Sequence, residues 1–234
     1  MSPLTFSSVF SGIGGIDEGL VSAGWQCRWQ IEIDDYCREV LAWNFTPDAM
    51  RLGDVRQVDG ADLERVDLLA GGFPCQDIAR VGRRAGIDGA KSGLWAEMYR
   101  LVCSLRPRYV LVENSTSLLV RGLDRVLADL AAVGYDAEWD CLSAAAFGAP
   151  HIRDRLYLLA YPGSERRASP TQTVFAGWTG AQLHGGWAPQ PGVGRVANGI
   201  PNQVDRLKAL GNAVCPPIAA WLGRRILDAD KEPV

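Results

Sequence analysis

Short apolar runs alternate with longer amphipathic segments along the first 160 residues of the chain. The short runs are rich in β-branched and aromatic residues and predict strands over Thr5–Phe10, Cys27–Ile33, Val66–Ala70, Tyr109–Val112 and Leu156–Ala160. The longer segments repeat apolar residues with a helical period and predict helices over Ile16–Ala23, Asp35–Asn44, Gly93–Ser104, Leu118–Val133 and Pro217–Asp228. This alternation predicts an α/β fold, a mostly parallel sheet with helices on both faces, whose ligands bind at the carboxyl ends of the strands.

One segment departs from this pattern. Residues Ala168–Gly194 contain no charged residue, are rich in Gly, Pro, Thr and Gln, and show no clear period, which indicates an inserted loop lobe. We therefore divide the chain into a core over residues 1–161, a short lobe over residues 162–198 and a C-terminal segment over residues 199–234 that returns to the core.

Composition places the chain among ordinary globular proteins. It has 234 residues, of which 47% are hydrophobic and 22% charged, so disordered, fibrous and disulfide-dense classes are excluded. The chain has no secretory leader pattern and no apolar run long enough to span a bilayer, so we expect a cytoplasmic protein with no membrane contact. Its six cysteines include no C-x-x-C pair and there are only two histidines, so we expect reduced thiols and no metal site.

The charge is unevenly distributed. Residues 1–75 carry five Lys/Arg against twelve Asp/Glu, whereas residues 151–225 carry nine against three. The local excess of basic residues is compatible with a polyanion held on one side of the molecule. Scattered, solvated arginines would give the same count.

Two features near the N-terminus favour a nucleotide-like ligand. The turn Phe10–Gly15 follows the first predicted strand and suits a dinucleotide, a phosphate or S-adenosylmethionine, although it could also be a purely structural turn. The strict G-x-G-x-x-G pattern is missing because Asp17 stands at its third glycine, which disfavours phosphate. Glu32 ends the second apolar run, where a carboxylate can hold a ribose diol or can simply be exposed. Asp54 is a weaker candidate for an adenine contact.

A thiol follows the predicted strand Val66–Ala70. Cys75 lies on a turn made by Gly and Pro rather than inside an apolar period, which favours a nucleophile over an inert buried cysteine. The next residues combine glycines with a basic set that could close over a phosphate backbone, or could form a solvated surface loop: Arg80, Arg83, Arg84 and Lys91.

The run Gly72–Gln76, taken with Phe10–Gly15, resembles the DNA (cytosine-5) methyltransferase family, in its compact bacterial or phage form. The family's Glu-Asn-Val motif is matched by Glu113-Asn114-Ser115, in which Ser115 replaces valine. Its Gln-x-Arg-x-Arg signature after Gly-x-Pro is matched by Gly148–Arg155, in which His151 replaces glutamine. Its closing motif is matched by Gly211–Pro216. The five motifs occur in family order from Phe10 to Pro216.

This resemblance implies an S-adenosylmethionine-dependent methyltransferase fold of Rossmann-like type with a small target-recognition lobe. It implies transfer of a methyl group from S-adenosylmethionine to C5 of a flipped cytosine, through a covalent bond between Cys75 and C6. Protonated Glu113 would hydrogen-bond the base at N3 and its amine, and Arg155 would bind O2. Arg155 and Arg153 together would lower the pKa of the thiol.

The resemblance also carries a set of candidate binding residues. The cofactor residues it implies are Phe10, Gly12, Ile13, Gly14, Gly15, Glu32, Ile33, Asp54, Pro74, Leu94, Asn212 and Val214. The candidates for DNA contact are Gln76, Arg80, Arg83, Arg84, Arg166, Arg167 and Arg195. Because the lobe between the paired arginines and the closing motif is short, we expect a short or relaxed recognition site.

Three alternative hypotheses about the function compete with this one. The same thiol chemistry would serve a tRNA cytosine-5 methyltransferase, and a non-catalytic DNA-binding relative could use the pocket only to hold a base. A generic nucleotide-cofactor oxidoreductase would leave the Pro-Cys-Gln and Glu-Asn motifs unexplained. The favoured reading is a monomeric enzyme of a bacterial or phage-infected cell that acts on double-stranded DNA, in the setting of restriction and modification.

Overall fold

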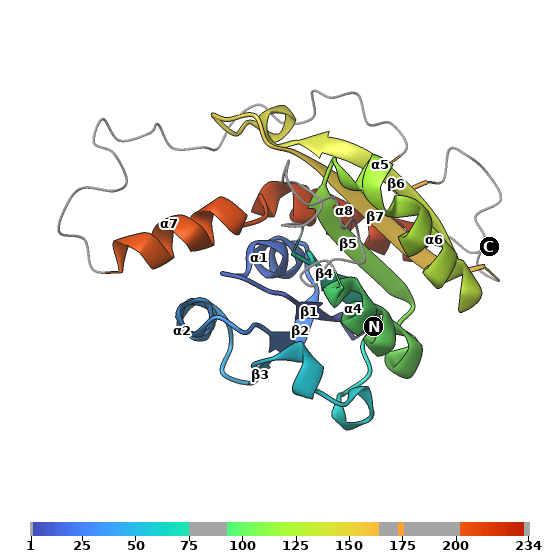
Figure 1. Cartoon of the computed structure of the whole chain (residues 1–234), viewed down its shortest axis with the longest axis horizontal. Coiled ribbons are helices and arrows are strands. Elements are labelled where there is room, and N and C mark those ends of the chain that lie inside the picture. Colours follow the sequence, from blue (N-terminus) through green and yellow to red (C-terminus); the bar gives the residue numbers. More distant parts are fainter. Residues whose placement is uncertain (1, 75–92, 164–172, 176–201, 232–234) are drawn as a thin grey trace.

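The computed structural model of the chain describes residues 2–74, 93–163, 173–175 and 202–231. The described residues form a seven-stranded sheet in the order β3-β2-β1-β4-β5-β7-β6, shown in Figure 1. The strands are β1 (Thr5–Val9), β2 (Gln26–Ile31), β3 (Met50–Leu52), β4 (Leu68–Gly71), β5 (Tyr109–Ser115), β6 (Tyr135–Ser143) and β7 (Asp154–Pro162). Strands β3, β2, β1, β4 and β5 pair in parallel, and β7 runs antiparallel to both β5 and β6.

Helices cover both faces of this sheet. They are α1 (Gly15–Ser22), α2 (Asp35–Asn44), α4 (Leu94–Leu105), α5 (Leu118–Arg121), α6 (Leu123–Ala132), α7 (Gln203–Asn212) and α8 (Pro216–Lys231). One buried cluster joins the sheet to α1 and α8 through residues such as Leu20 and Leu222, and a second joins it to α4 and α6 through Met98 and Leu130. The predicted α/β architecture, with a mostly parallel sheet between helical layers, is therefore confirmed.

Several predicted elements need correction. The segment Leu118–Val133 is two helices, because Gly122 between α5 and α6 has a φ of 149°, which breaks the helical path. The sequence pattern missed β6, an edge strand whose residues are mostly only half-buried and therefore do not alternate cleanly. It also missed the three-residue strand β3 and the helix α7.

The C-terminal helix α8 packs closely on α1. A Cβ atom added at Gly19 of α1 would lie 2.4 Å from the carbonyl oxygen of Pro216 and 2.5 Å from Cβ of Ala219. The indole Nε1 of Trp25, which follows α1, donates a hydrogen bond to the carbonyl oxygen of Gly223 at 3.1 Å. This close approach brings the start of α8 beside the first turn of α1.

Replacing Gly19 with alanine should therefore destabilise the fold. The added methyl group meets backbone of α8, which cannot rotate away as a side chain could, so we expect Gly19→Ala to lower the free energy of unfolding by about 1–3 kcal/mol. The matched control is Gly211→Ala in α7, where an added Cβ meets nothing within 4 Å and the change should be neutral or slightly stabilising. Urea unfolding curves of the two variants measure the difference, and equal curves would contradict this account of the α1–α8 contact.

Candidate active site

The turn after β1 combines an open position with two crowded ones. Gly12 (φ 56°) and Gly14 (φ 84°) have left-handed backbone conformations, and Phe10 (φ 58°) shares them although it carries a side chain. A Cβ at Gly12 would meet nothing within 4 Å, so this position is open to a ligand. A Cβ at Gly14 would lie 2.4 Å from the Phe45 ring, and one at Gly15 would lie 2.3 Å from the carbonyl oxygen of Val214.

Glu32 ties the end of β2 to this turn. One carboxylate oxygen, Oε2, accepts a hydrogen bond from the Gly12 amide at 2.8 Å, and the other, Oε1, accepts one from the Asp34 amide at 2.8 Å. The side chain of the next residue, Ile33, is 62% exposed, which is unusual for so apolar a residue. A fixed carboxylate and an exposed apolar side chain thus stand side by side in sequence at the edge of the glycine turn.

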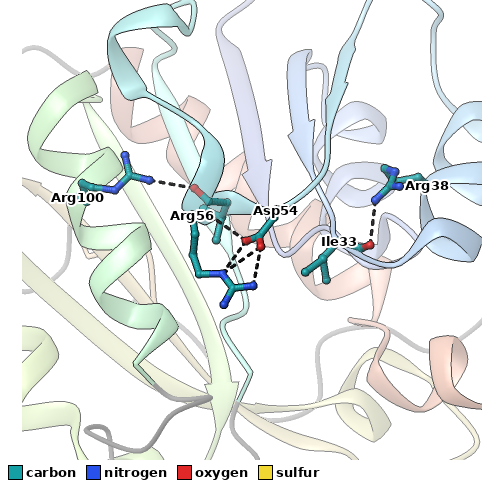
Figure 2. A network of polar contacts seen from close by, with 6 residues as sticks. Ile33, Arg38, Asp54, Arg56 and Arg100 are labelled. Atoms are coloured by element: carbon teal, nitrogen blue, oxygen red, sulfur yellow. Dashed lines mark hydrogen bonds and ion pairs between the residues drawn. The ribbon is translucent and has the colours of Figure 1, made fainter.

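Figure 2 shows the polar contacts around the neighbouring segments that follow β2 and β3. Arg38 of α2 donates to the carbonyl oxygen of Ile33 at 2.9 Å, which fixes the backbone there.

The carboxylate of Asp54 caps the short helix Val55–Gln57 by accepting from the Arg56 amide at 3.0 Å, and it also accepts from Arg56 Nε at 2.9 Å. The hydrogen bond from the Arg56 side chain is the main cause that lowers the pKa of Asp54. Arg100 of α4 holds the same helix through the carbonyl oxygen of Val55 at 2.9 Å.

The closing motif lies against both the glycine turn and the segment that leads into β7. The carbonyl oxygen of Val214 faces Gly15, and Arg153 Nη1 donates to the carbonyl oxygen of Gly211 at 2.9 Å. Lys208 of α7 forms an ion pair with Asp34 at 2.6 Å, so the same helix also contacts the loop beyond Glu32. Three motifs far apart in the sequence therefore meet at one edge of the sheet.

The buried acid of the site is Glu113, near the end of β5. Its residue is only 8% exposed, and its Oε2 lies so near the backbone of Gly72 that a Cβ there would approach within 2.7 Å. Its Oε1 lies 3.3 Å from Nε of Arg155 on β7. The adjacent Asn114 donates from Nδ2 to the carbonyl oxygen of Phe73 at 3.1 Å. The Glu-Asn pair is thus fixed to the turn that leads from β4 toward Cys75.

Burial controls the protonation of this acid. Burial raises the pKa of Glu113 to about 7, while the positive charges of Arg155 and Arg153 offset part of the effect. The pKa of Arg153 is lowered, mainly by burial and secondly by repulsion from the positive charge of Arg155. The Glu113 carboxyl group can therefore serve as a hydrogen-bond donor near neutral pH, which an ordinary exposed glutamate cannot do.

The structure accounts for part of the residue set expected from the sequence. It brings together Glu113, Arg155, Arg153, Glu32, the glycine turn and Val214, and it describes the chain up to Pro74 and again from Gly93, the residue before Leu94. Eight of the candidates lie outside the described residues: Cys75, Gln76, Arg80, Arg83, Arg84, Arg166, Arg167 and Arg195.

Two contributions to the site were missed from sequence. Gly72 leaves the space that the Glu113 carboxyl group fills, and Asn114 holds the Phe73 carbonyl. The Gly71-Gly72 doublet at the end of a buried strand is a signal of close approach that could have revealed the first. Within the described ranges, no group of three or more His, Cys, Asp or Glu residues could hold a metal ion, and no helix has the length and apolar character to cross a bilayer.

Solved structures that share this fold include methyltransferases. A prophage-encoded Escherichia coli protein, described as a DNA modification methyltransferase, matches with a TM-score of 0.60 at 26% identity over 74% of this chain and 50% of that one. The S. pombe Dnmt2 methyltransferase matches with a TM-score of 0.60 over 74% of this chain and 55% of that one, and its 24% identity shows the fold alone. The fold is therefore the Rossmann-like fold of S-adenosylmethionine-dependent methyltransferases.

Sequence comparisons define the family more closely. The model of the C-5 cytosine-specific DNA methylase family matches residues 4–176. The chain is 31% identical to the type II methyltransferase M.NgoBV of Neisseria gonorrhoeae over 175 residues, which is 68% of this chain and 41% of that protein. It is 35% identical to M2.BsuMI of Bacillus subtilis over 161 residues, 65% of this chain and 41% of that protein. The chain belongs to the C-5 cytosine-specific DNA methylase family, and it spans about two fifths of the length of these relatives.

The raised pKa of Glu113 predicts a specific dependence of stability on pH. Because the folded state holds the proton more tightly than the unfolded chain, the stability of the wild type relative to Glu113→Gln should be greatest below the ordinary glutamate pKa of 4.5. It should fall as the pH rises toward 7, by on the order of 3 kcal/mol, and stay constant above that.

Urea unfolding of both proteins at several pH values measures this difference. The exposed Glu39→Gln in α2 is the control for removing a carboxylate. Curves for the wild type and Glu113→Gln that run parallel from pH 4.5 to 8 would refute the pKa shift.

Proposed function

We propose that the protein transfers a methyl group from S-adenosylmethionine to C5 of cytosine in double-stranded DNA. The observation that carries this proposal is the buried Glu113 carboxyl group, whose pKa of about 7 allows it to be protonated, beside Arg155 and against the turn that leads to Cys75. Membership of the C-5 cytosine-specific DNA methylase family supports the same chemistry.

The reaction needs electron density in a ring that is a poor nucleophile. The Cys75 thiolate forms a bond to C6 of the cytosine, and the displaced electron pair accumulates on the ring, where protonated Glu113 donates a hydrogen bond to N3. Arg155 binds O2 and, with Arg153, stabilises the thiolate. When bound, S-adenosylmethionine supplies the electrophilic methyl group that C5 takes up. Loss of the C5 proton and cleavage of the S–C6 bond then release 5-methylcytosine.

The residues around the glycine turn fit the cofactor. Gly12 leaves open space beside the turn. Each oxygen of the Glu32 carboxylate accepts one hydrogen bond from a backbone amide and keeps a further lone pair for a hydroxyl group of a ribose. Exposed Ile33 offers an apolar face to an adenine ring. Asp54 would contact the adenine amine with a carboxylate that also accepts a hydrogen bond from Arg56.

The target base must leave the duplex before Cys75 can reach it, because C6 is stacked between neighbouring bases. The three arginines Arg80, Arg83 and Arg84 and the arginines of the lobe would hold the DNA backbone. The short lobe over residues 162–198 supports a short or relaxed recognition site. We place the protein in the cytoplasm of a bacterial or phage-infected cell, as a modifying enzyme of the restriction and modification type.

A mechanism trap tests the nucleophile. DNA that contains 5-fluorocytosine has no removable proton at C5, so wild-type protein with S-adenosylmethionine should form an adduct that survives denaturation. Cys75→Ser should form none, and denaturing gels followed by mass spectrometry detect the difference. An adduct formed by Cys75→Ser would move the nucleophile to another residue.

Labelled methyl transfer distinguishes the nucleic acid. We expect incorporation into duplex DNA and none into tRNA, with the methylated positions sharing a short sequence in bisulfite sequencing of plasmid from cells that express the protein. Transfer to tRNA alone would support the second candidate enzyme and overturn the DNA proposal. A long, strict recognition sequence would overturn the expected role of the short lobe. Binding of DNA without transfer would favour the non-catalytic relative.

A further inference from the structure

A carboxyl group lies completely buried beneath the glycine turn. Asp17, in the first turn of α1, is 0% exposed and stands where a G-x-G-x-x-G pattern would have its third glycine. Its Oδ1 accepts hydrogen bonds from Ser8 Oγ of β1 at 2.7 Å and from Gln30 Nε2 of β2 at 2.8 Å. Ser8 and Gln30 are themselves 1% and 0% exposed, so one buried atom joins α1 to two neighbouring strands.

This cluster extends into the glycine turn through Ser11. The hydroxyl oxygens of Ser8 and Ser11 are 2.6 Å apart, and because Ser8 donates its only hydroxyl hydrogen to Asp17, Ser11 is the donor between them. Ser11 also anchors the turn through its backbone, since its amide donates to the carbonyl oxygen of Ile31 at 3.1 Å and its carbonyl oxygen accepts from the Gly14 amide at 2.9 Å. The next residue, Gly12, donates to Glu32.

The cluster contains two buried oxygen atoms without a hydrogen-bond donor in the described part of the chain. Oδ2 of Asp17 and Oε1 of Gln30 have no hydrogen-bond partner among the residues that the structure describes. A proton on Oδ2 turns this oxygen from an unpaired acceptor into a donor and removes the charge from a fully buried side chain. Burial raises the pKa of Asp17, and the hydrogen bonds from Gln30 and Ser8 and the charge of Arg51 on β3 offset only part of this effect. Cys27 of β2 also faces the acid, and burial raises the pKa of its thiol to about 12, so it is neutral.

We propose that Asp17, in its neutral form, is a positioning residue for S-adenosylmethionine: it fixes Ser8, Ser11 and Gln30, and thereby holds the Gly12 amide and Glu32 where the cofactor's ribose binds. This inference rests on the proposed function for the cofactor. It assigns Asp17 a role through other residues, because a fully buried side chain cannot touch the ligand.

The neutral form makes asparagine a close mimic. The Asp17→Asn side chain keeps a carbonyl oxygen that accepts from Ser8 and Gln30, and its amide is a neutral donor in place of the protonated oxygen. Asp17→Ala removes the oxygen that accepts from both residues. Calorimetric titration with S-adenosylhomocysteine should give Asp17→Asn a dissociation constant within about threefold of the wild type and Asp17→Ala one about tenfold weaker. In steady-state kinetics, the weaker binding by Asp17→Ala should appear mainly as a raised KM for S-adenosylmethionine, with kcat nearly unchanged.

Two further variants separate positioning from loss of stability. Leu130→Ala in α6, which is buried at the other end of the sheet, destabilises the fold and should leave the dissociation constant unchanged. Ser11→Ala removes the last link of the cluster near the surface and should weaken binding severalfold with little change in the unfolding midpoint. It keeps the inference testable if Asp17→Ala does not fold.

The outcomes distinguish this inference from the proposed function. Wild-type protein that does not bind S-adenosylhomocysteine would contradict the proposed cofactor itself. Wild-type binding with equal affinity in Ser11→Ala or Asp17→Ala would overturn the positioning role alone. An Asp17→Asn protein as weak as Asp17→Ala would overturn the neutral form, and an equal loss of affinity in Leu130→Ala would reduce the effect to stability.

Discussion

The buried contact between the Glu113 carboxyl group and the backbone of Gly72 is the constraint on which the site depends. A carboxyl group that is largely shielded from water holds its proton to higher pH, and here that burial raises its pKa to about 7. The contact also fixes position, because Asn114 ties the same strand to the Phe73 carbonyl. One arrangement thus gives the acid its chemistry and joins it to the turn that leads to Cys75.

The sheet order explains how distant motifs reach one another. Strands β1, β2, β4 and β5 run parallel, so their carboxyl ends lie together. The site is built at these ends, from the glycine turn, Glu32, the Gly72 turn and Glu113. The antiparallel β7 starts at this edge rather than ending there, which places Arg155 beside Glu113. Close packing of α8 on α1 places the carbonyl oxygen of Val214 against Gly15.

The strand and helix pattern was predictable wherever hydrophobic periodicity was strong, as in β1, β4 and α4. It failed where burial is partial, as in the edge strand β6, and where a single glycine redirects the chain at Gly122. Motif order was enough to nominate Glu113, Arg153 and Arg155. It could not show that Gly15 serves the contact with Val214, because such close approaches depend on tertiary packing between residues 199 positions apart in the chain.

The most direct test of the account is the titration of Glu113 itself. Carbon-13 NMR of protein labelled at the glutamate carboxyl carbons, with Glu113→Gln to assign the resonance, measures its pKa in the folded state. We predict a pKa of about 7 for Glu113, and a higher pKa in Arg155→Ala because the nearby positive charge is removed. A midpoint at the ordinary glutamate value of 4.5, unchanged in Arg155→Ala, would contradict the buried, protonated acid on which the proposed chemistry depends.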